Sequence, residues 1–159
     1  MKHSSLALWV LLLALSSCSS HSVRSVSLHS QADSVSYAMA YMTGYLHGSI
    51  YKDTTGEGIL EYIAAYDNGY RDAALAPLDS TPKVNLKDYE HPYMASRGYR
   101  LGVSSNHWVQ TGYIKTVPIT LSQPIFRQGL INGLYRDTTI MTMDQANTYM
   151  RSTRSDLFR

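Results

Sequence analysis

Apolar and small residues recur at spacings of three and four along five stretches of the chain after residue 32. This period places them on one face of an α-helix, so the pattern predicts an all-α fold of about five helices. We expect two hairpins of antiparallel helices followed by a C-terminal helix. Together they form one helical domain over residues 33–159, which is long enough to bury a core.

Capping residues and prolines mark where several of these helices begin. Asp33 with Ser34 can cap the first helix, and Pro92 suits the first turn of the third. Thr142 and Gln145 have the spacing of a capping box, which predicts the start of the last helix.

Two stretches without helical period separate the predicted helices. Residues 76–90 contain prolines and polar residues and form a linker. Residues 105–121 form a long irregular loop, with a short extended segment at 116–120, where β-branched residues dominate.

The two hairpins, residues 33–75 and 91–150, share short motifs that indicate a duplication. Ala40-Tyr-Met-Thr-Gly44 matches Gly98-Tyr-Arg-Leu-Gly102, and Tyr66-Asp-Asn-Gly69 matches Phe126-Arg-Gln-Gly129. Glycine inside a helix costs about 1 kcal/mol relative to alanine, but it lets a neighbouring helix cross closely. We therefore predict a helix-packing or dimerisation motif made of Tyr41, Gly44, Tyr66, Gly69, Tyr99, Gly102, Phe126 and Gly129.

The start of the chain has the order of parts found in an export signal. Lys2 precedes an apolar run over residues 6–15, which is too short to cross a bilayer, and then Ser16, Ser17 and Cys18 follow. The sequence Leu15-Ser-Ser-Cys18 resembles the lipobox of bacterial lipoproteins, in which the cysteine is acylated and becomes the first residue. This implies a signal peptide at 1–17 and a lipid on Cys18, the chain's one cysteine. The other interpretation is an ordinary secretory signal beside an unrelated cysteine.

Residues 18–32 are rich in serine and lack a helical period, so we expect a disordered tether between the lipid and the domain. Removing residues 1–17 takes only Lys2 from the 14 Lys and Arg residues, against 12 Asp and Glu, so the net charge falls to about +1. The charges are scattered singly, which argues against a nucleic-acid partner.

The motifs at residues 33–44 and 66–73, with their second copies at 98–102, 126–129 and 141–146, resemble a known domain. It is the helical amino-terminal dimerisation domain of FKBP-type peptidyl-prolyl isomerases. In that family the domain is all-helical, is commonly secreted or lipid-anchored, and joins two chains. A separate β-rich domain catalyses the peptidyl-prolyl isomerisation. Here the first copy lacks a clear third helix, and little chain follows Met150. We therefore expect the scaffold without its enzyme.

No arrangement typical of catalysis or of a cofactor stands out. His47, His91 and His107 lack partners at metal-ligand spacing, so we expect no metal site. Glu57 and Glu61 lie near a predicted helix start and are expected to be solvated. Phosphate-binding and nucleophile motifs do not occur, and the chain is not expected to be an enzyme.

Tyrosines form two stripes with i, i+4 spacing, at 37/41/45 and 62/66/70. They are expected to line the seam of the hairpins, although an aromatic platform for a sugar or peptide has the same spacing.

Two functions follow from these observations. The first is a membrane-anchored, non-catalytic scaffold that binds a protein partner or forms a homodimer, with a role in protein folding. It would be anchored in the outer membrane of a bacterial cell envelope through acylated Cys18 and would face the periplasm. The second is a ligand-binding or toxin-neutralising lipoprotein, which would use the 105–121 loop, Trp108, Tyr113 and the tyrosine stripes.

Overall fold

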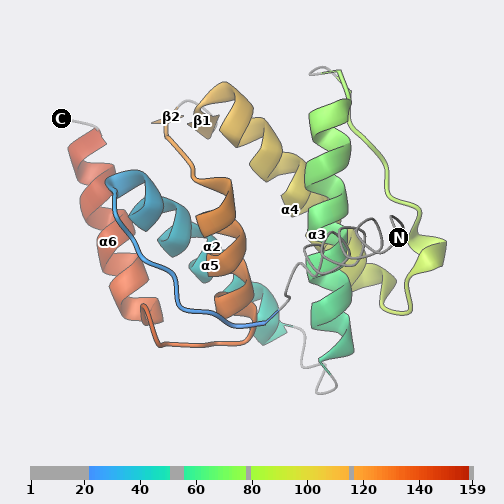
Figure 1. Ribbon diagram of the computed structural model, residues 1–159, viewed down its shortest axis with the longest axis horizontal. Coiled ribbons are helices and arrows are strands. Elements are labelled where there is room, and N and C mark those ends of the chain that lie inside the picture. The colour runs from blue at the N-terminus through green and yellow to red at the C-terminus, as the bar shows by residue number, and fades with distance from the viewer. Residues whose placement is uncertain (1–21, 51–55, 78–79, 115–116, 158–159) are drawn as a thin grey trace, which may run out of the picture.

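The computed structural model describes residues 22–50, 56–77, 80–114 and 117–157. It confirms the all-α prediction, because within these ranges five α-helices carry the fold (Figure 1). They are α2 (Gln31–Ile50), α3 (Glu57–Leu75), α4 (Pro92–Thr111), α5 (Gln123–Leu134) and α6 (Met143–Leu157). None of the described helices is both long enough and apolar enough to serve as a membrane span.

The helix starts follow from local hydrogen bonds. The capping box at α6 is confirmed: the backbone N–H of Thr142 donates to Gln145 Oε1 at 2.8 Å, and that of Gln145 donates to Thr142 Oγ1 at 3.2 Å. At α2 the predicted cap, Asp33 with Ser34, is wrong, because the helix already begins at Gln31. Ser30 Oγ accepts from the Asp33 backbone, and the Asp33 carboxylate accepts from the Ser30 backbone, both at 3.1 Å. Ser30 is therefore the cap, and Asp33 lies in the first turn.

The predicted loop over 105–121 is wrong for residues 105–111, because α4 continues to Thr111. The start of this added helical stretch is buried: Ser105 Oγ donates to the hydroxyl of Tyr66 of α3 at 3.1 Å, and Asn106 is also buried. The helix ends at Gly112, which has a φ of 68° that favours glycine. Two short strands follow, β1 (Tyr113–Ile114) and β2 (Val117–Pro118), which pair antiparallel. Only β2 lies within the extended segment predicted at 116–120.

The helices do not pair as the predicted hairpins. Helix α3 packs along α4, while α2 packs on α5 and α6. Each main pair therefore takes one helix from each repeat. The paired helices also run in the same direction, since Gly98 lies on Tyr62 and Gly102 lies on Tyr66. The prediction of antiparallel hairpins assumed that the two helices of one repeat pack together, whereas the glycine-lined faces of these helices select partners across the repeats.

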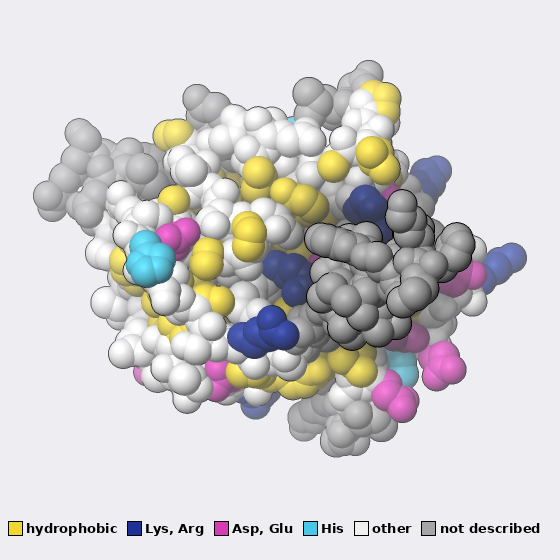
Figure 2. Space-filling model, viewed as in Figure 1, with side chains coloured by type: hydrophobic (Ala, Val, Ile, Leu, Met, Phe, Trp, Pro, Cys, Tyr) yellow, Lys and Arg dark blue, Asp and Glu magenta, His cyan; other side chains and the backbone are white. Residues whose placement is uncertain are grey.

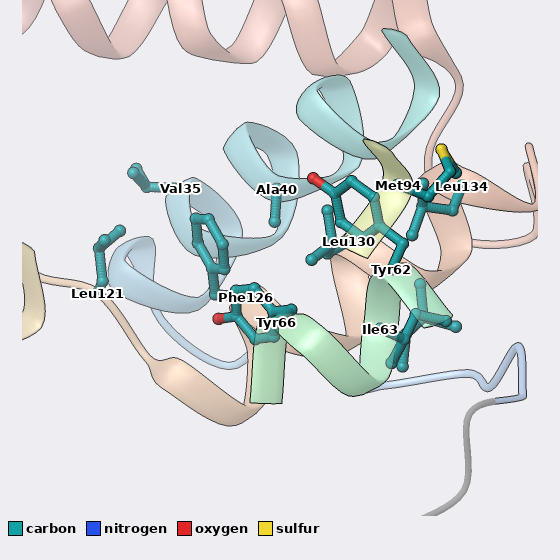
Figure 3. Close-up of a cluster of buried hydrophobic side chains, with 11 residues drawn as sticks. Val35, Ala40, Tyr62, Ile63, Tyr66, Met94, Leu121, Phe126, Leu130 and Leu134 are labelled. Atoms are coloured by element: carbon teal, nitrogen blue, oxygen red, sulfur yellow. The ribbon is translucent and has the colours of Figure 1, made fainter. Parts of the chain in front are cut away.

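One apolar core joins the two helix pairs (Figure 3). Tyr62 and Tyr66 of α3 meet Phe126 and Leu130 of α5, and all four side chains are buried. The ring of Tyr66 stacks on that of Phe126 at 6.3 Å with an interplanar angle of 15°. The repeats are thus joined into one body through their second helices.

The tether predicted as disordered over 18–32 is wrong for the residues that the structure describes. Gln31 and Ala32 belong to α2, and the extended segment 22–30 lies against the helices. Val26 and Leu28 pack on the cluster around Tyr37 and Tyr41. Val84, before α4, packs on the α3/α4 pair in the same way. Val84 follows Val26 by 58 residues, and Gly102 follows Gly44 by the same number. The repeat therefore includes the segment that precedes its first helix.

Between the repeats, the linker over 76–90 holds one short 3-10 helix, η1 (Leu86–Asp88). The side chain of Asn85 caps it by accepting from the backbone of Lys87 at 3.3 Å.

Candidate functional site: the helix crossings and a hollow beside Trp108

The motif glycines lie where the paired helices cross. At the α3/α4 crossing, a methyl group on Gly102 would lie 2.7 Å from the backbone nitrogen of Tyr70 and closer still to the carbonyl oxygen of Tyr66. Gly69 meets the backbone of Tyr99 in the same way. Real Cβ atoms do not come this close to backbone atoms, so the two helices could not approach this far with larger residues.

The α2/α5 crossing repeats this geometry, but with a shift of one turn from the sequence match. Gly44 lies on Leu130 and Leu134, as Gly102 lies on Tyr66 and Tyr70. The counterpart of Gly69 is therefore Gly133, which meets the backbone of Tyr41. The motif match predicts Gly129 as that counterpart, but Gly129 lies one turn earlier, on Tyr37.

The correct register had a signal in the sequence. Tyr66-Asp-Asn-Gly69 and Leu130-Ile-Asn-Gly133 share an Asn-Gly pair, which is more specific than the aromatic-x-x-Gly pattern. Phe126 therefore corresponds to Tyr62 rather than to Tyr66, and it contributes to the core between the pairs.

The tyrosine stripes form core. Tyr37, Tyr41, Tyr62 and Tyr66 are fully buried, which removes them from any exposed aromatic platform. In α2 the ring of Tyr37 stacks on that of Tyr41, with the ring centroids 5.9 Å apart. The alternative in which these stripes hold a ligand is contradicted for these four residues.

Most of these hydroxyls have defined partners, and burial changes their acidity. The Tyr37 hydroxyl accepts from Asn132 Nδ2 at 3.0 Å, and burial raises its pKa to about 12. Burial also raises the pKa of Tyr66. Tyr62 shares a 2.6 Å hydrogen bond with His47 Nδ1. Burial, helped by the nearby charge of Arg97, lowers the pKa of His47, which favours its neutral form.

An ion pair that the sequence analysis did not identify connects the two helix pairs. Arg127 of α5 donates from Nε and Nη2 to the two carboxylate oxygens of Asp67 of α3, both at 2.7 Å. The charge-assisted hydrogen bonds to Asp67 raise the pKa of Arg127. No spacing rule relates two residues this far apart in sequence, so only the fold could bring them together.

The expectation that Glu61 is solvated is wrong. Its carboxylate accepts from the backbone N–H groups of Glu90 at 2.8 Å and His91 at 2.6 Å, at the start of α4. His91 Nδ1 also lies 3.3 Å from Glu61 Oε2. A negative charge at a helix N-terminus is favourable, so Glu61 fixes α4 against α3. Glu57 is exposed, as expected.

A hollow of about 370 Å³ lies between the C-terminal ends of α3 and α4. Asn106, His107 and Trp108 line it from α4, opposite Ala73 and Pro77. The Trp108 ring packs edge-on against Phe126, with the ring centroids 6.3 Å apart, and Trp108 is half-buried. Trp108, predicted as a loop residue, is thus a helix residue beside a hollow. Tyr113 lies in β1, and its side chain is outside what the structure describes.

The predicted lipidation site, Cys18, and the signal peptide at 1–17 lie outside the described residues. No protein-family model, curated protein or solved structure matches this chain. The resemblance to the FKBP dimerisation domain therefore stays a prediction.

Proposed function

We propose that this chain is a lipid-anchored, non-catalytic protein-binding scaffold of the bacterial cell envelope, and that it works as a monomer. The observation that supports this best is the exchange of helices between the repeats. Each glycine crossing pairs one helix of the first repeat with one helix of the second. A single copy would need a second chain to complete these crossings, whereas the duplicated chain supplies both partners.

The exchange changes the expectation of a homodimer. In the FKBP-type domain that the sequence resembles, the module joins two chains. Here the motif residues that would make such a joint, including Gly44, Gly69 and Gly102, are buried inside one body. We therefore expect the partner to be a different protein, bound outside the crossings.

Cys18 supplies the anchor in this proposal. The apolar run and small residues before it support a lipoprotein signal, and acyl chains on one cysteine hold a protein on a membrane without a spanning helix. Anchoring would concentrate the scaffold at the membrane surface.

Two measurements test the proposal. Intact mass of the protein extracted from bacterial membranes should show an acylated chain that begins at Cys18, and Cys18→Ser should move the protein to the soluble fraction. Light scattering of residues 19–159 should give the mass of one chain at every concentration tested. An unmodified Cys18 in membrane-free extract would refute the anchor, and a dimer that grows with concentration would refute the monomer.

The hollow beside Trp108 favours a second candidate, the binding of a small ligand. Its lining combines the aromatic residue Trp108 with the polar residues Asn106 and His107, as the lining of ligand sites commonly does. Trp9 and Trp108 are the chain's two tryptophans, so in residues 19–159 fluorescence reports on Trp108 alone. Titration with oligosaccharides or short peptides should shift this emission if the hollow binds them, and His107→Ala should weaken the response. Unchanged emission with every probe would count against this candidate.

A further inference from the structure

The chain is attached to the folded body almost as far back as the predicted lipid. The carbonyl oxygen of Ser22 accepts from Gln128 Nε2 at 3.2 Å. Two residues later, the backbone N–H of Arg24 donates to Asn132 Oδ1 at 3.3 Å, and its carbonyl oxygen accepts from Asn132 Nδ2 at 2.9 Å. Residues 19–21 are therefore all that separates Cys18 from the body.

This length limits how far the body can stand from the anchor. An extended chain spans at most about 3.5 Å per residue, so Cys18 and Ser22 lie within about 14 Å, whatever the conformation between them. The polar layer on each side of a bilayer's hydrocarbon core is about 5–8 Å thick. If the acyl chains on Cys18 enter the hydrocarbon, Ser22 must lie at or close to the membrane surface.

The end of the molecule near Ser22 is rich in exposed apolar side chains. Val23, Leu60 and Tyr135 line one open hollow of about 440 Å³ together with Ser22. Leu46 and Ile50, in the last turns of α2, are 50% and 65% exposed. We call these five residues, Val23, Leu46, Ile50, Leu60 and Tyr135, the apolar end.

Two contacts show that the elements carrying the apolar end converge. Gly48 of α2 lies on the backbone of Leu134, next to Tyr135, and His47 reaches Tyr62 near the start of α3. In Figure 1 the last turn of α2, the start of α3 and the end of α5 lie at the same lower edge. Figure 2 shows hydrophobic side chains gathered along that edge in the same view.

We propose that the apolar end rests on the lipid bilayer surface, with its side chains in the headgroup layer. The short reach from Cys18 makes the bilayer the nearest apolar phase, and a tyrosine beside aliphatic residues suits a membrane interface. The exposed charges nearby, Arg24, Arg136 and Glu57, are of both signs, so the contact depends on apolar burial rather than on anionic lipid. In cells this contact requires the lipid on Cys18, so the inference rests on the function proposed above.

The contact would fix the orientation of the whole body. Leu75 ends α3 at the opposite end from Leu60, about 22 Å away at 1.5 Å per residue, and is 81% exposed. The hollow beside Trp108 adjoins that far end. The membrane contact would therefore direct the hollow and the C-terminal ends of α3 and α4 away from the lipid.

Tryptophan quenching tests this orientation with a matched pair of variants. In a Trp108→Phe background, Leu60→Trp and Leu75→Trp each place one indole at an exposed position of α3. The chain from Cys18 onward, which contains every described element, is coupled through Cys18 to maleimide-bearing lipid in phosphatidylcholine vesicles with brominated acyl chains. We expect bromine to quench Leu60→Trp several-fold more strongly than Leu75→Trp, with circular dichroism showing that both variants are folded.

Equal quenching of the two variants, or stronger quenching of Leu75→Trp, would overturn the inference. So would a dimer, seen by light scattering in the absence of lipid, that Leu60→Glu dissociates, because a second copy would then cover the apolar end. Chemical coupling supplies the anchor in this experiment. Its result is therefore independent of whether Cys18 is acylated in cells. A failure of the proposed lipid anchor can thus be told apart from a failure of the proposed membrane contact.

Discussion

Glycine is the residue that determines how closely these helices pack. At exposed helix positions, changing glycine to alanine stabilises a helix by up to about 1 kcal/mol. At Gly102 the added methyl group would instead meet the backbone of Tyr66 and Tyr70. Backbone atoms cannot move aside as the end of a flexible side chain can, so packing outweighs helix propensity here.

We predict that Gly102→Ala lowers the free energy of unfolding by about 1–3 kcal/mol, the usual cost of overfilling a packed site. Arg100→Ala, on the exposed side of the same helix, should change it by less than about 0.5 kcal/mol. Urea denaturation followed by circular dichroism measures both. A stabilised Gly102→Ala variant would mean that the helices are not in contact at this position.

The buried tyrosines make stability depend on alkaline pH. The pKa of Tyr37 is raised to about 12 by burial, and that of Tyr99 to about 12 by burial and by its 2.9 Å hydrogen bond to Asp72. In the unfolded chain both groups return to their ordinary value of 10.0. Below pH 10 both states keep the proton. Above it the unfolded state ionises first, which favours unfolding.

We therefore expect the melting temperature to change little between pH 8 and pH 9.5 from this source, and to fall steeply as the pH rises from 10 to 12. Absorbance at 295 nm should show a set of tyrosines that ionise only as the helical signal is lost. Ionisation of all tyrosines near pH 10 with the helical signal intact would contradict the burial of these hydroxyls.

At the scale of elements, Asn132 holds the segment 22–30 against α5. Its side chain accepts from the backbone of Arg24 and from Gln128, and it donates to Arg24 and to Tyr37. Asn68 precedes Gly69 as Asn132 precedes Gly133, but it donates to the hydroxyl of Tyr89 and not to a backbone. The two asparagines therefore occupy corresponding positions, but only Asn132 binds the backbone of the segment that precedes its partner helix.

We predict that Asn132→Ala releases the segment 22–30, because several hydrogen bonds of about 1 kcal/mol each are lost. Trypsin should then cut after Arg24 roughly ten times faster than in the unchanged protein. Asn68→Ala should leave this rate unchanged. Mass spectrometry of the early fragments gives the comparison. Equal rates in the two variants would show that Asn132 does not fix the segment.

At the scale of the whole molecule, the exchange makes each repeat incomplete. Helices α2 and α3 of the first repeat find their main partners, α5 and α4, in the second. The core joins all four, and the ion pair between Asp67 and Arg127 adds a polar contact between the pairs. Stability should therefore belong to the whole chain and not to either repeat.

Separating the repeats in the linker over 76–90 tests this. We expect residues 19–80 alone and residues 81–159 alone to show little helix by circular dichroism, because each would expose its buried tyrosine and glycine faces. An equimolar mixture should recover most of the helical signal. A repeat that folds alone as a monomer with a cooperative transition would show that the hairpins are independent, against the exchanged pairing.

The sequence by itself determined the local features of this protein. Period, prolines and caps predicted the helices and the capping box of Thr142 and Gln145, because these depend on residues within one or two turns of each other. The short motifs also indicated a duplication and predicted packing roles for Gly44, Gly69 and Gly102, which lie at the helix crossings.

Only the tertiary structure decided which helices pack together. Every helix carries an apolar face and small residues, so the sequence pattern is compatible with pairing within a repeat and with pairing between repeats. Docking of residues 22–30 and capping of α4 by Glu61 depend on contacts between residues far apart in the chain. Such contacts leave no periodic signal, because the backbone atoms that receive them belong to any sequence.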